Sequence, residues 1–406
     1  MDVKGAYLNG RLEEEVYMRQ PDGYHDGTDK VCRLIKTLYG LKQAGREWNE
    51  EFDARIKGLG FERLHADPCA YIRVTDEHIE VITAWVDDLL LFADTAEMMR
   101  KLKDEFKAVF EVTDLREPQK IVGIEIERDH IHGRLKISQT QYIDNLLAKY
   151  NMTDCNPVAT PMDLSVNLDD EPELPEDSPI RKLYASLVGS LMFLAVATRG
   201  PDLGAPVRKL AAYISRPGQA HWKAAKRVLR YLKGTRMLGI VLVKEDNLNK
   251  RCLLRGYSDA SFNYESDAKS VTGYAFTSAG GAISWGSRKQ SLTALSATEA
   301  ECLALTETIQ EAVWLRTLLE ELKLPQDTIP IYEDNQGAIA LAVNPQFHRR
   351  SKHFNPKLYL IREMIAEGVI GIEYGPTGEM PADVLTKALP KNTHQAHVRS
   401  LGLASD

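Results

Sequence analysis

The first part of the chain alternates between helical and strand-like patterns of hydrophobic and polar positions. Residues 45–61 carry apolar side chains at helical spacing and stop at Gly60, which predicts a helix. Two apolar runs, 79–86 and 89–93, are separated only by Asp87 and Asp88, which predicts a tight hairpin. We therefore expect strands and helices to alternate over residues 1–162.

The middle of the chain is predicted to be helical. The uncharged run 183–198 is 16 residues long, shorter than the ~20 residues that a membrane span needs, so we expect a buried core helix. A second helix is predicted from His221 to Gly234, since glycine is a common C-terminal stop. Before both, residues 163–178 carry seven acidic side chains, no basic ones and two prolines, which predicts a solvated linker.

The last third of the chain opens with predicted strands, at 255–262 and at 271–285, the latter a pair turned at Gly280 and Gly281. A long helix from Ser296 to Leu322 follows, then strands at 329–334 and 369–375 and a last helix from Ala382. A β-meander followed by alternating helices and strands predicts a mixed sheet with helices packed on it. The fold class predicted for the whole chain is α+β or mixed α/β.

Asp2, Asp87 and Asp88 form a first candidate catalytic set. Phosphoryl transfer to a nucleic acid 3′-hydroxyl needs two divalent cations about 3.5–4 Å apart, and carboxylate oxygens suit Mg²⁺. An Asp-Asp pair by itself is more often a polar hairpin turn. Two apolar strands around a charged pair favour a metal site, because burying carboxylates without a partner is costly.

Four more acidic residues lie at predicted strand ends and helix starts: Asp259, Glu301, Asp334 and Asp383. At one edge of a sheet they would converge, and since such a cluster repels itself without cations, a two-metal hydrolytic site explains it naturally. Each acid also has a structural interpretation, as a turn residue, a strand terminator or a helix-start acid favoured by the helix dipole. Ser296 and Glu299 fit a capping box, which leaves Glu301 free to face elsewhere.

Several segments of the chain resemble, in order and spacing, the reverse transcriptase of copia-type retrotransposons: MDVKGAYLNG, EEEVYMRQPDGY, KVCRLIKTLYGLKQAGREWNEEF and WVDDLLLF. The resemblance implies that Asp2 is the first palm carboxylate, and that Asp87 and Asp88 are the pair of the Tyr-Val-Asp-Asp box. It also implies that Tyr7 is the aromatic gate that excludes a 2′-hydroxyl, and that Gln43 lies in the segment lining the template and the incoming nucleotide.

The resemblance extends to the ribonuclease H domain of the same elements through GYSDASF, SATEAECLAL, YEDNQGAIAL and PADVLTKAL. It places that domain's Asp-Glu-Asp-Asp set on the four acids at strand ends and helix starts. The implied domains are a palm and thumb at 1–162 with the fingers missing, an acidic linker at 163–178, a helical connection at 179–250, and a ribonuclease H-like domain with a mixed five-stranded sheet at 251–406.

The chain departs from the family pattern at several positions. Trp85 stands where Tyr is usual, Gly45 stands where Pro is common, and Gly200 looks inserted in the Thr-Arg-Pro-Asp element. The sequence starts one residue before Asp2, so we expect the preceding palm strand and the fingers to be missing and the polymerase half to be impaired by truncation.

A basic stripe lies on the helix predicted from residue 221. Its members recur at three- and four-residue steps and therefore share one helix face: Lys223, Lys226, Arg227, Arg230 and Lys233. Residues 221–244 contain seven basic side chains and no acidic ones. A solvated face is the structural alternative, but a stripe of single sign favours contact with nucleic acid phosphates.

The predicted function is RNA-directed DNA synthesis together with ribonuclease H cleavage of RNA–DNA hybrids by two-metal phosphoryl transfer. The resemblance implies Mg²⁺, with Mn²⁺ as an alternative, two ions per site, and as partners an RNA template, a DNA primer, an RNA–DNA hybrid and dNTPs. The alternative function is a catalytically inactive retroelement remnant that at most binds nucleic acid.

The composition is compatible with that function. The chain of 406 residues has 51 Lys and Arg against 58 Asp and Glu, a net charge of −7, and residues 163–178 alone contribute −7, so the remainder balances at 51 against 51. The acidic total therefore does not exclude a nucleic-acid enzyme. Because the N-terminus lacks a secretory signal and the five cysteines are scattered, we expect an intracellular protein without a membrane partner, cytoplasmic (in a virus-like particle by the resemblance) or nuclear.

Overall fold

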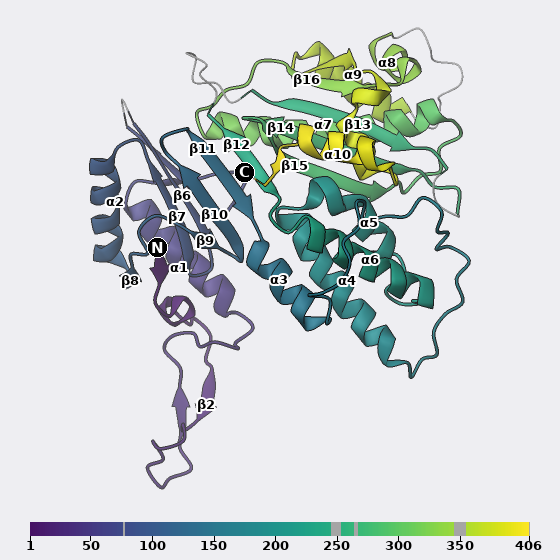
Figure 1. Cartoon of the computed structure of the whole chain (residues 1–406). Coiled ribbons are helices and arrows are strands. Elements are labelled where there is room, and N and C mark those ends of the chain that lie inside the picture. Colours follow the sequence, from purple (N-terminus) through teal and green to yellow (C-terminus); the bar gives the residue numbers. More distant parts are fainter. Residues whose placement is uncertain (76–77, 245–252, 264–266, 345–354, 406) are drawn as a thin grey trace. The chain divides into compact units, whose positions relative to one another are not determined.

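The computed structural model describes residues 1–75, 78–244, 253–263, 267–344 and 355–405. They form two compact units (Figure 1). Unit 1 comprises residues 1–122 with 321–323, and unit 2 comprises the remainder. The division near residue 122 differs from the predicted end of the first domain at residue 162, and the predicted boundary at 250/251 lies outside the described residues.

An antiparallel sheet forms the centre of unit 1. Its strands, in spatial order, are β4 (Glu62–Arg63), β5 (Ala70–Val74), β6 (Ile79–Trp85), β7 (Asp88–Ala93), β1 (Asp2–Val3) and β8 (Val112–Thr113). Helices α1 (Ala44–Gly58) and α2 (Ala96–Val109) share one core with this sheet. Trp48, Phe52 and Ile56 of α1 enter that core because residues four apart lie on one helix face. The predicted helix and hairpin are confirmed.

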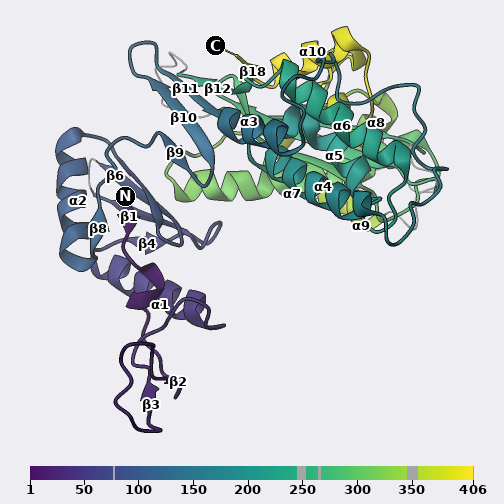
Figure 2. The same cartoon turned by 60° about the horizontal axis from the view of Figure 1, so that its bottom comes forward.

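The other elements of unit 1 are short. They are η1 (Ala6–Asn9), a 3₁₀ helix, and β2 (Tyr17–Arg19), β3 (Val31–Arg33) and β9 (Lys120–Ile121). Strands β2 and β3 pair as an antiparallel ribbon that extends away from the sheet of unit 1 (Figure 2).

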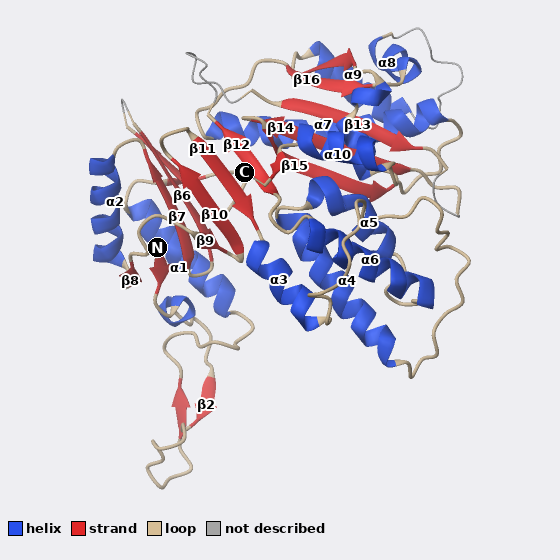
Figure 3. Cartoon of the chain, in the orientation of Figure 1, coloured by secondary structure: helices blue, strands red, loops and turns tan. Residues whose placement is uncertain are grey.

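Four helices of unit 2 form one layer (Figure 3). They are α3 (Thr140–Lys149), α4 (Pro179–Ala197), α5 (Gly200–Ala211) and α6 (Gln219–Gly234). Helix α4 is long and apolar enough to span a membrane by length and composition, but Leu187, Leu191 and Leu194 on it are fully buried in the core of this layer. The helix predicted at 183–198 is therefore present with one face in this core, whereas Leu183, Met192 and Val196 on it are exposed.

Two sheets complete unit 2. The first, antiparallel, contains β10 (Ile124–Asp129), β11 (Arg134–Ser138), β12 (Gly239–Val243) and β18 (Leu403–Ala404). The second has the order β15 (Gly281–Lys289), β14 (Val271–Ser278), β13 (Arg255–Ser261), β16 (Ile329–Glu333) and β17 (Ile370–Tyr374). Because β13 is antiparallel to β14 and parallel to β16, this is the predicted mixed five-stranded sheet.

Helices pack on the mixed sheet, and one of them is shorter than predicted. The remaining elements are α7 (Ala297–Glu321), α8 (Gln336–Val343), α9 (Asn355–Ala366), η2 (Thr377–Glu379), η3 (Pro381–Leu385) and α10 (Lys391–Ser400). The prediction of a last helix from Ala382 is wrong: a 3₁₀ turn covers Pro381–Leu385 and α10 begins only after Pro390. A proline disfavours helical backbone at the residue before it, which separates the two segments.

Most residues of the acidic segment 163–178 are exposed, as its composition predicts, but a few of its side chains contact unit 2. Leu168 is 8% exposed and belongs to the core of the helical layer. Asp169 accepts a hydrogen bond from Lys209 at 2.7 Å, and Glu171 accepts one from the backbone N–H of Ala220 at 2.8 Å. A few apolar and paired acidic side chains thus attach this segment to unit 2.

Candidate active sites

Two of the predicted catalytic acids lie at one edge of the mixed sheet. Asp259 lies in β13, and Asp334 directly follows β16, the parallel neighbour of β13. Parallel neighbours run in the same direction, so their carboxyl ends meet at the same edge. Asp259 is 2% exposed there, and Asp334 is half-buried.

The start of α7 brings a third carboxylate to the same place. Ser296 accepts a hydrogen bond from the N–H of Glu299 at 3.2 Å, and the Glu299 carboxylate accepts one from the N–H of Leu295 at 2.9 Å. The capping box is thus present, although the return bond goes to Leu295 rather than to Ser296. Glu301 remains free for the site, and ligand oxygens of Asp259, Glu301 and Asp334 all lie within 4.8 Å of one another.

Asp383 reaches this edge because β14 carries a glycine. Gly273 lies opposite Asp259, and a Cβ atom on Gly273 would be 2.5 Å from Thr386 Cγ2 and 2.9 Å from the carbonyl oxygen of Ala382. Without a side chain at this position, η3 packs directly on the strand. The Asp383 carboxyl then lies close enough to Asp259 to raise the pKa of that residue.

A lysine and a threonine join the fourth acid to the first. Lys387 Nζ lies 2.7 Å from Asp383 Oδ1 and 4.0 Å from Asp259 Oδ2. The Thr386 hydroxyl donates to Asp259 Oδ2 and also lies 3.1 Å from the carbonyl oxygen of Asp383. Asp383 is therefore held beside the group of three rather than within it.

The electrostatics of this edge disfavour negative charge. Burial, and then the Asp383 carboxylate, raise the pKa of Asp259, while burial, and then the Glu333 carboxylate, raise the pKa of Glu301. Cations relieve such repulsion, and carboxylate oxygens are the ligands that Mg²⁺ prefers. Within the residues that the structure describes, Glu301 Oε2 is buried without a hydrogen-bond partner, so the group fits a divalent cation.

Three residues of this site were not predicted from the sequence: Glu333, Thr386 and Lys387. Glu333 is fully buried behind the group, and burial raises its pKa. One of its oxygens accepts the N–H of Asn335 at 3.1 Å. Glu333 and Asp334 are adjacent acids at a strand end, the only sequence signal for this residue, whereas nothing in the sequence distinguishes the threonine and the lysine.

Two members of the first predicted set, Asp2 and Asp88, lie side by side in the sheet of unit 1, and Asp87 lies in the turn before Asp88. Asp2 in β1 pairs directly with Asp88 in β7, and the N–H of Val3 donates to the carbonyl oxygen of Asp87 at 2.9 Å. Burial, and then Asp87 and Asp2, raise the pKa of Asp88. Strand β1 is held on both sides, by β7 and β8. Among the described residues, however, these three carboxylates do not form a group as close as that in unit 2.

The hairpin turn that carries these aspartates is held by a tryptophan. Trp85 pairs with Asp88, so the turn residues are Val86 and Asp87 rather than the two aspartates. Val86 has a φ of 58°, which is uncommon for a β-branched residue. Trp48 of α1 donates from Nε1 to the Val86 carbonyl oxygen at 2.8 Å and so fixes this conformation.

The structure brings the two predicted nucleotide-contacting residues to the start of α1. Gln43 precedes α1, and its carbonyl oxygen accepts the N–H of Glu47 at 3.0 Å. A Cβ atom on Gly45 would lie 3.9 Å from the Tyr7 ring, whose centroid lies 4.9 Å from that of Tyr39. Both Tyr7 and Gln43 are half-buried. Their roles toward a nucleotide stay predictions.

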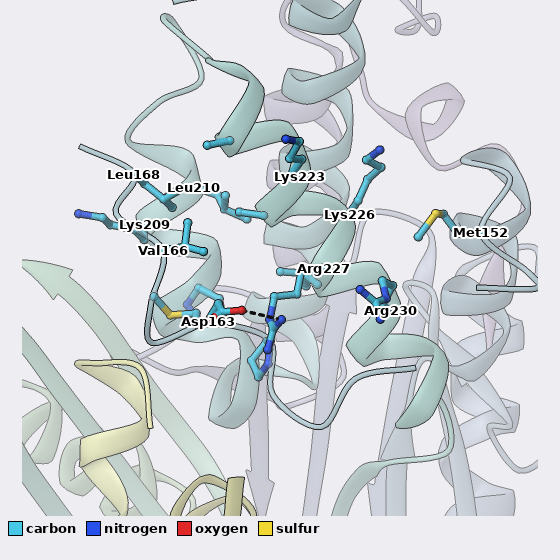
Figure 4. A pocket seen from close by; sticks show the side chains of 16 residues that line it. Met152, Asp163, Val166, Leu168, Lys209, Leu210, Lys223, Lys226, Arg227 and Arg230 are labelled. Carbon is cyan, nitrogen blue, oxygen red and sulfur yellow. Dashed lines mark hydrogen bonds and ion pairs between the residues drawn. The ribbon is translucent and has the colours of Figure 1, made fainter. Parts of the chain in front are cut away.

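The basic stripe of α6 is partly used inside the protein. Arg227 pairs with Asp163 at 3.0 Å (Figure 4), and Arg230 donates to the carbonyl oxygen of Asn156 at 2.7 Å. Lys223 is exposed, and Lys226 lies over the ring of Trp222 at 5.5 Å. The stripe is therefore not one continuous solvated surface.

Sequence comparisons place the chain among retroelement proteins. Residues 1–164 match the family described as reverse transcriptase (RNA-dependent DNA polymerase). The whole chain aligns with the retrovirus-related Pol polyprotein from transposon TNT 1-94 of Nicotiana tabacum at 39% identity. An alignment that covers 99% of the chain shows 37% identity to the retrovirus-related Pol polyprotein from transposon RE2 of Arabidopsis thaliana. It spans 31% and 27% of the lengths of these two relatives. The alignment with a transposon Ty5-1 protein of Saccharomyces cerevisiae covers 77% of this chain and the full length of that protein, at 32% identity.

Solved structures give weaker likenesses. Ribonuclease H1 from Halobacterium salinarum matches 33% of this chain and 93% of its own length, at 18% identity with a TM-score of 0.24. A foamy viral protease–reverse transcriptase in complex with double-stranded DNA matches 89% of this chain and 55% of its own length, at 13% identity with a TM-score of 0.23.

Proposed function

Because the chain belongs to the family of copia-type retrotransposon Pol polyproteins, in their reverse transcriptase region, we propose that it cleaves the RNA strand of RNA–DNA hybrids by metal-dependent phosphoryl transfer. The site of this ribonuclease H activity is the acidic edge of the mixed sheet, at Asp259, Glu301, Asp334 and Asp383. The observation that carries the proposal is the approach of three carboxylates to within 4.8 Å of one another.

The residues of the site have separate tasks in this proposal. Asp259, Glu301 and Asp334 would hold Mg²⁺ or Mn²⁺ through their carboxylate oxygens. Asp383 would become a ligand of a second cation once its ion pair with Lys387 is broken. Two bound cations supply the charge that activates a water molecule and stabilises the leaving oxygen. Thr386 orients Asp259 by donating to Oδ2, which would leave the other oxygen of this carboxylate available as a ligand.

The test is cleavage of a labelled RNA–DNA hybrid with Mg²⁺ by the wild type and by Glu301→Gln. We expect Glu301→Gln to cleave no more than the metal-free wild type. Glu299→Gln is the matched control, since it lies two residues away on α7 and glutamine also serves in a capping box. Cleavage by Glu301→Gln at the wild-type rate, or cleavage that EDTA does not stop, would contradict the proposal.

We propose a second activity, RNA-directed DNA synthesis, at Asp2, Asp87 and Asp88. The support is the family match over residues 1–164 and the direct pairing of Asp2 with Asp88. An RNA template, a DNA primer and dNTPs are the proposed partners, with two divalent cations at the site. Primer extension by this chain, absent in Asp88→Asn, is the expected result; extension that persists in Asp88→Asn would refute the assignment.

The same hybrid and primer substrates distinguish nucleic-acid binding from catalysis. A protein that binds the hybrid in a filter assay, yet neither cleaves it nor extends a primer at any Mg²⁺ or Mn²⁺ concentration, would be the inactive remnant. That outcome would contradict both proposed activities while leaving the family assignment intact.

A further inference from the structure

A groove in unit 2 belongs to neither proposed active site. Its cavity volume is about 540 Å³ (Figure 4). One wall is α6, and the other walls come from the acidic segment, from α5 and from the chain between α3 and the acidic segment. Its apolar lining residues are Met152, Pro161, Met162, Val166, Leu168, Pro206, Leu210, Ala220, Ala224 and Val228.

The charged lining of the groove is almost entirely cationic. Its charged residues are Lys209, Lys223, Lys226, Arg227, Arg230 and one acid, Asp163. Asp163 pairs with Arg227 at 3.0 Å, and Lys209 pairs with Asp169 at 2.7 Å. Among the described residues, Lys223 and Lys226 form no ion pair, and Arg230 contacts only a neutral carbonyl oxygen. The groove therefore has an apolar floor and an uncompensated positive wall.

This combination selects among anionic partners. The phosphate backbone of a nucleic acid would place charged groups against the apolar floor, where desolvation without a partner is costly. An amphipathic helix satisfies both parts of the groove, because its apolar face can cover the floor while flanking carboxylates meet the lysines. Lys223 and Arg230 are seven residues apart, about 10 Å along α6, a length that two turns of a bound helix match.

We propose that this groove binds an amphipathic helix of a partner protein, with an apolar face flanked by Asp and Glu. Val166 and Lys226 would be central contacts: Val166 is 48% exposed on one side of the groove, and Lys226 lies on the other. Charge complementarity carries this choice of partner, and it does not depend on the activities proposed above.

Designed peptides provide a direct test. The probe is a fluorescein-labelled, 18-residue helical peptide with leucine at positions i, i+3, i+4 and i+7 and glutamate beside them, compared with the same peptide carrying lysine for glutamate and with a scrambled version. By fluorescence anisotropy we expect the glutamate peptide to bind at least about tenfold more tightly than either comparison peptide. Equal binding of all three peptides would overturn the proposal.

Variants with matched controls locate the binding site. Lys223→Glu with Lys226→Glu is expected to abolish the preference for the glutamate peptide, whereas Lys233→Glu, on the same helix but outside the groove, should leave it unchanged. Val166→Asp should weaken binding, and Leu164→Asp should not, because Leu164 is exposed in the same segment without lining the groove.

Nucleic acid is the competing occupant in this test. Single-stranded RNA or DNA that binds through Lys223 and Lys226 more tightly than the glutamate peptide, and displaces it, would refute the helix proposal in favour of phosphate contact. Failure to displace the peptide supports it. Circular dichroism of each variant establishes that a loss of binding does not come from loss of the fold.

Discussion

Replacing Asp259 by asparagine is expected to stabilise the metal-free protein, although it removes a buried catalytic side chain. In the folded state this carboxylate is 2% exposed and lies near the carboxylates of Glu301, Asp334 and Asp383. An amide of the same shape carries no charge, so it avoids both the burial of the charge and the repulsion. The cost of the substitution is a weaker interaction with Thr386.

The magnitude follows from the pKa of Asp259, which burial and the Asp383 carboxylate raise from 3.8 to about 7. Because the folded state binds a proton more tightly than the unfolded state, stability falls as pH rises between these two values and stays low above pH 7. At about 1.4 kcal/mol per pH unit, the interval of 7 − 3.8 corresponds to an upper limit of about 4.5 kcal/mol. The substitution also weakens the hydrogen bond from Thr386 to a charged group, which lowers the stability by about 2 kcal/mol. We therefore expect Asp259→Asn to raise the free energy of unfolding by about 1–2 kcal/mol at pH 8.

The assay is urea unfolding in EDTA at pH 5 and pH 8, with hydrogen exchange on the peptides of β13 and α7 to assign the transition to unit 2. The gain in the free energy of unfolding of Asp259→Asn over the wild type should be near zero at pH 5. With Mg²⁺ the wild type should become the more stable protein, because only the wild type would be stabilised by the cation. Glu363→Gln, an exposed acid on α9, is the control and should change stability by less than about 0.5 kcal/mol. Asp259→Asn less stable than the wild type at pH 8 in EDTA would refute the reasoning.

Two substitutions test the packing that supports the sites. Gly200→Ala should destabilise unit 2 by about 1–3 kcal/mol in urea unfolding, because the added Cβ would lie 1.6 Å from Trp285 Nε1. Gly189→Ala, in α4, is the control: no atom lies within 4 Å of the added Cβ, so the free energy of unfolding should rise by about 0.5–1 kcal/mol. A tolerated Gly200→Ala would contradict the contact. Trp48→Phe keeps an aromatic side chain but removes the indole N–H that donates to Val86 and part of the buried ring, so unit 1 should lose at least about 1 kcal/mol by thermal unfolding. An unchanged unfolding temperature would show that the turn does not depend on this bond.

The acidic edge of the mixed sheet was predictable because local patterns determine it. The strand patterns at 255–262 and 329–334 locate Asp259 and Asp334, and the capping box at Ser296 separates Glu301 from Glu299. The roles of Thr386 and Lys387 were not predictable, since they depend on the close packing of η3 against Gly273. That contact joins positions more than a hundred residues apart and leaves no mark in local hydrophobic periodicity.

In the acidic segment, composition predicts the exposure of most residues but not the contacts that a few of them make. A net count of seven acids predicts a solvated chain, yet Leu168 alone provides an apolar anchor, and Asp163 and Asp169 find cationic partners on α6 and α5. The same pairs remove Arg227 from the basic stripe. Average charge describes what a segment would do in isolation, whereas these contacts depend on which helices fold beside it.

Buried polar contacts join the helical layer to the part of unit 2 that carries the acidic edge. Arg199 and Asp202, at the start of α5, are fully buried and paired, and the Tyr231 hydroxyl of α6 donates to Asp202 at 2.9 Å. Because the Tyr231 hydroxyl donates its proton to Asp202, its oxygen can only accept a hydrogen bond from His394 Nε2, which lies 3.2 Å away. The imidazole of His394, on α10, therefore carries its proton on Nε2. Since a buried charged pair tolerates little displacement, α5 and α6 hold α10 in place, and α10 packs against the 3₁₀ turn that carries Asp383. The geometry of the fourth carboxylate thus depends on helices that precede the mixed sheet in the chain.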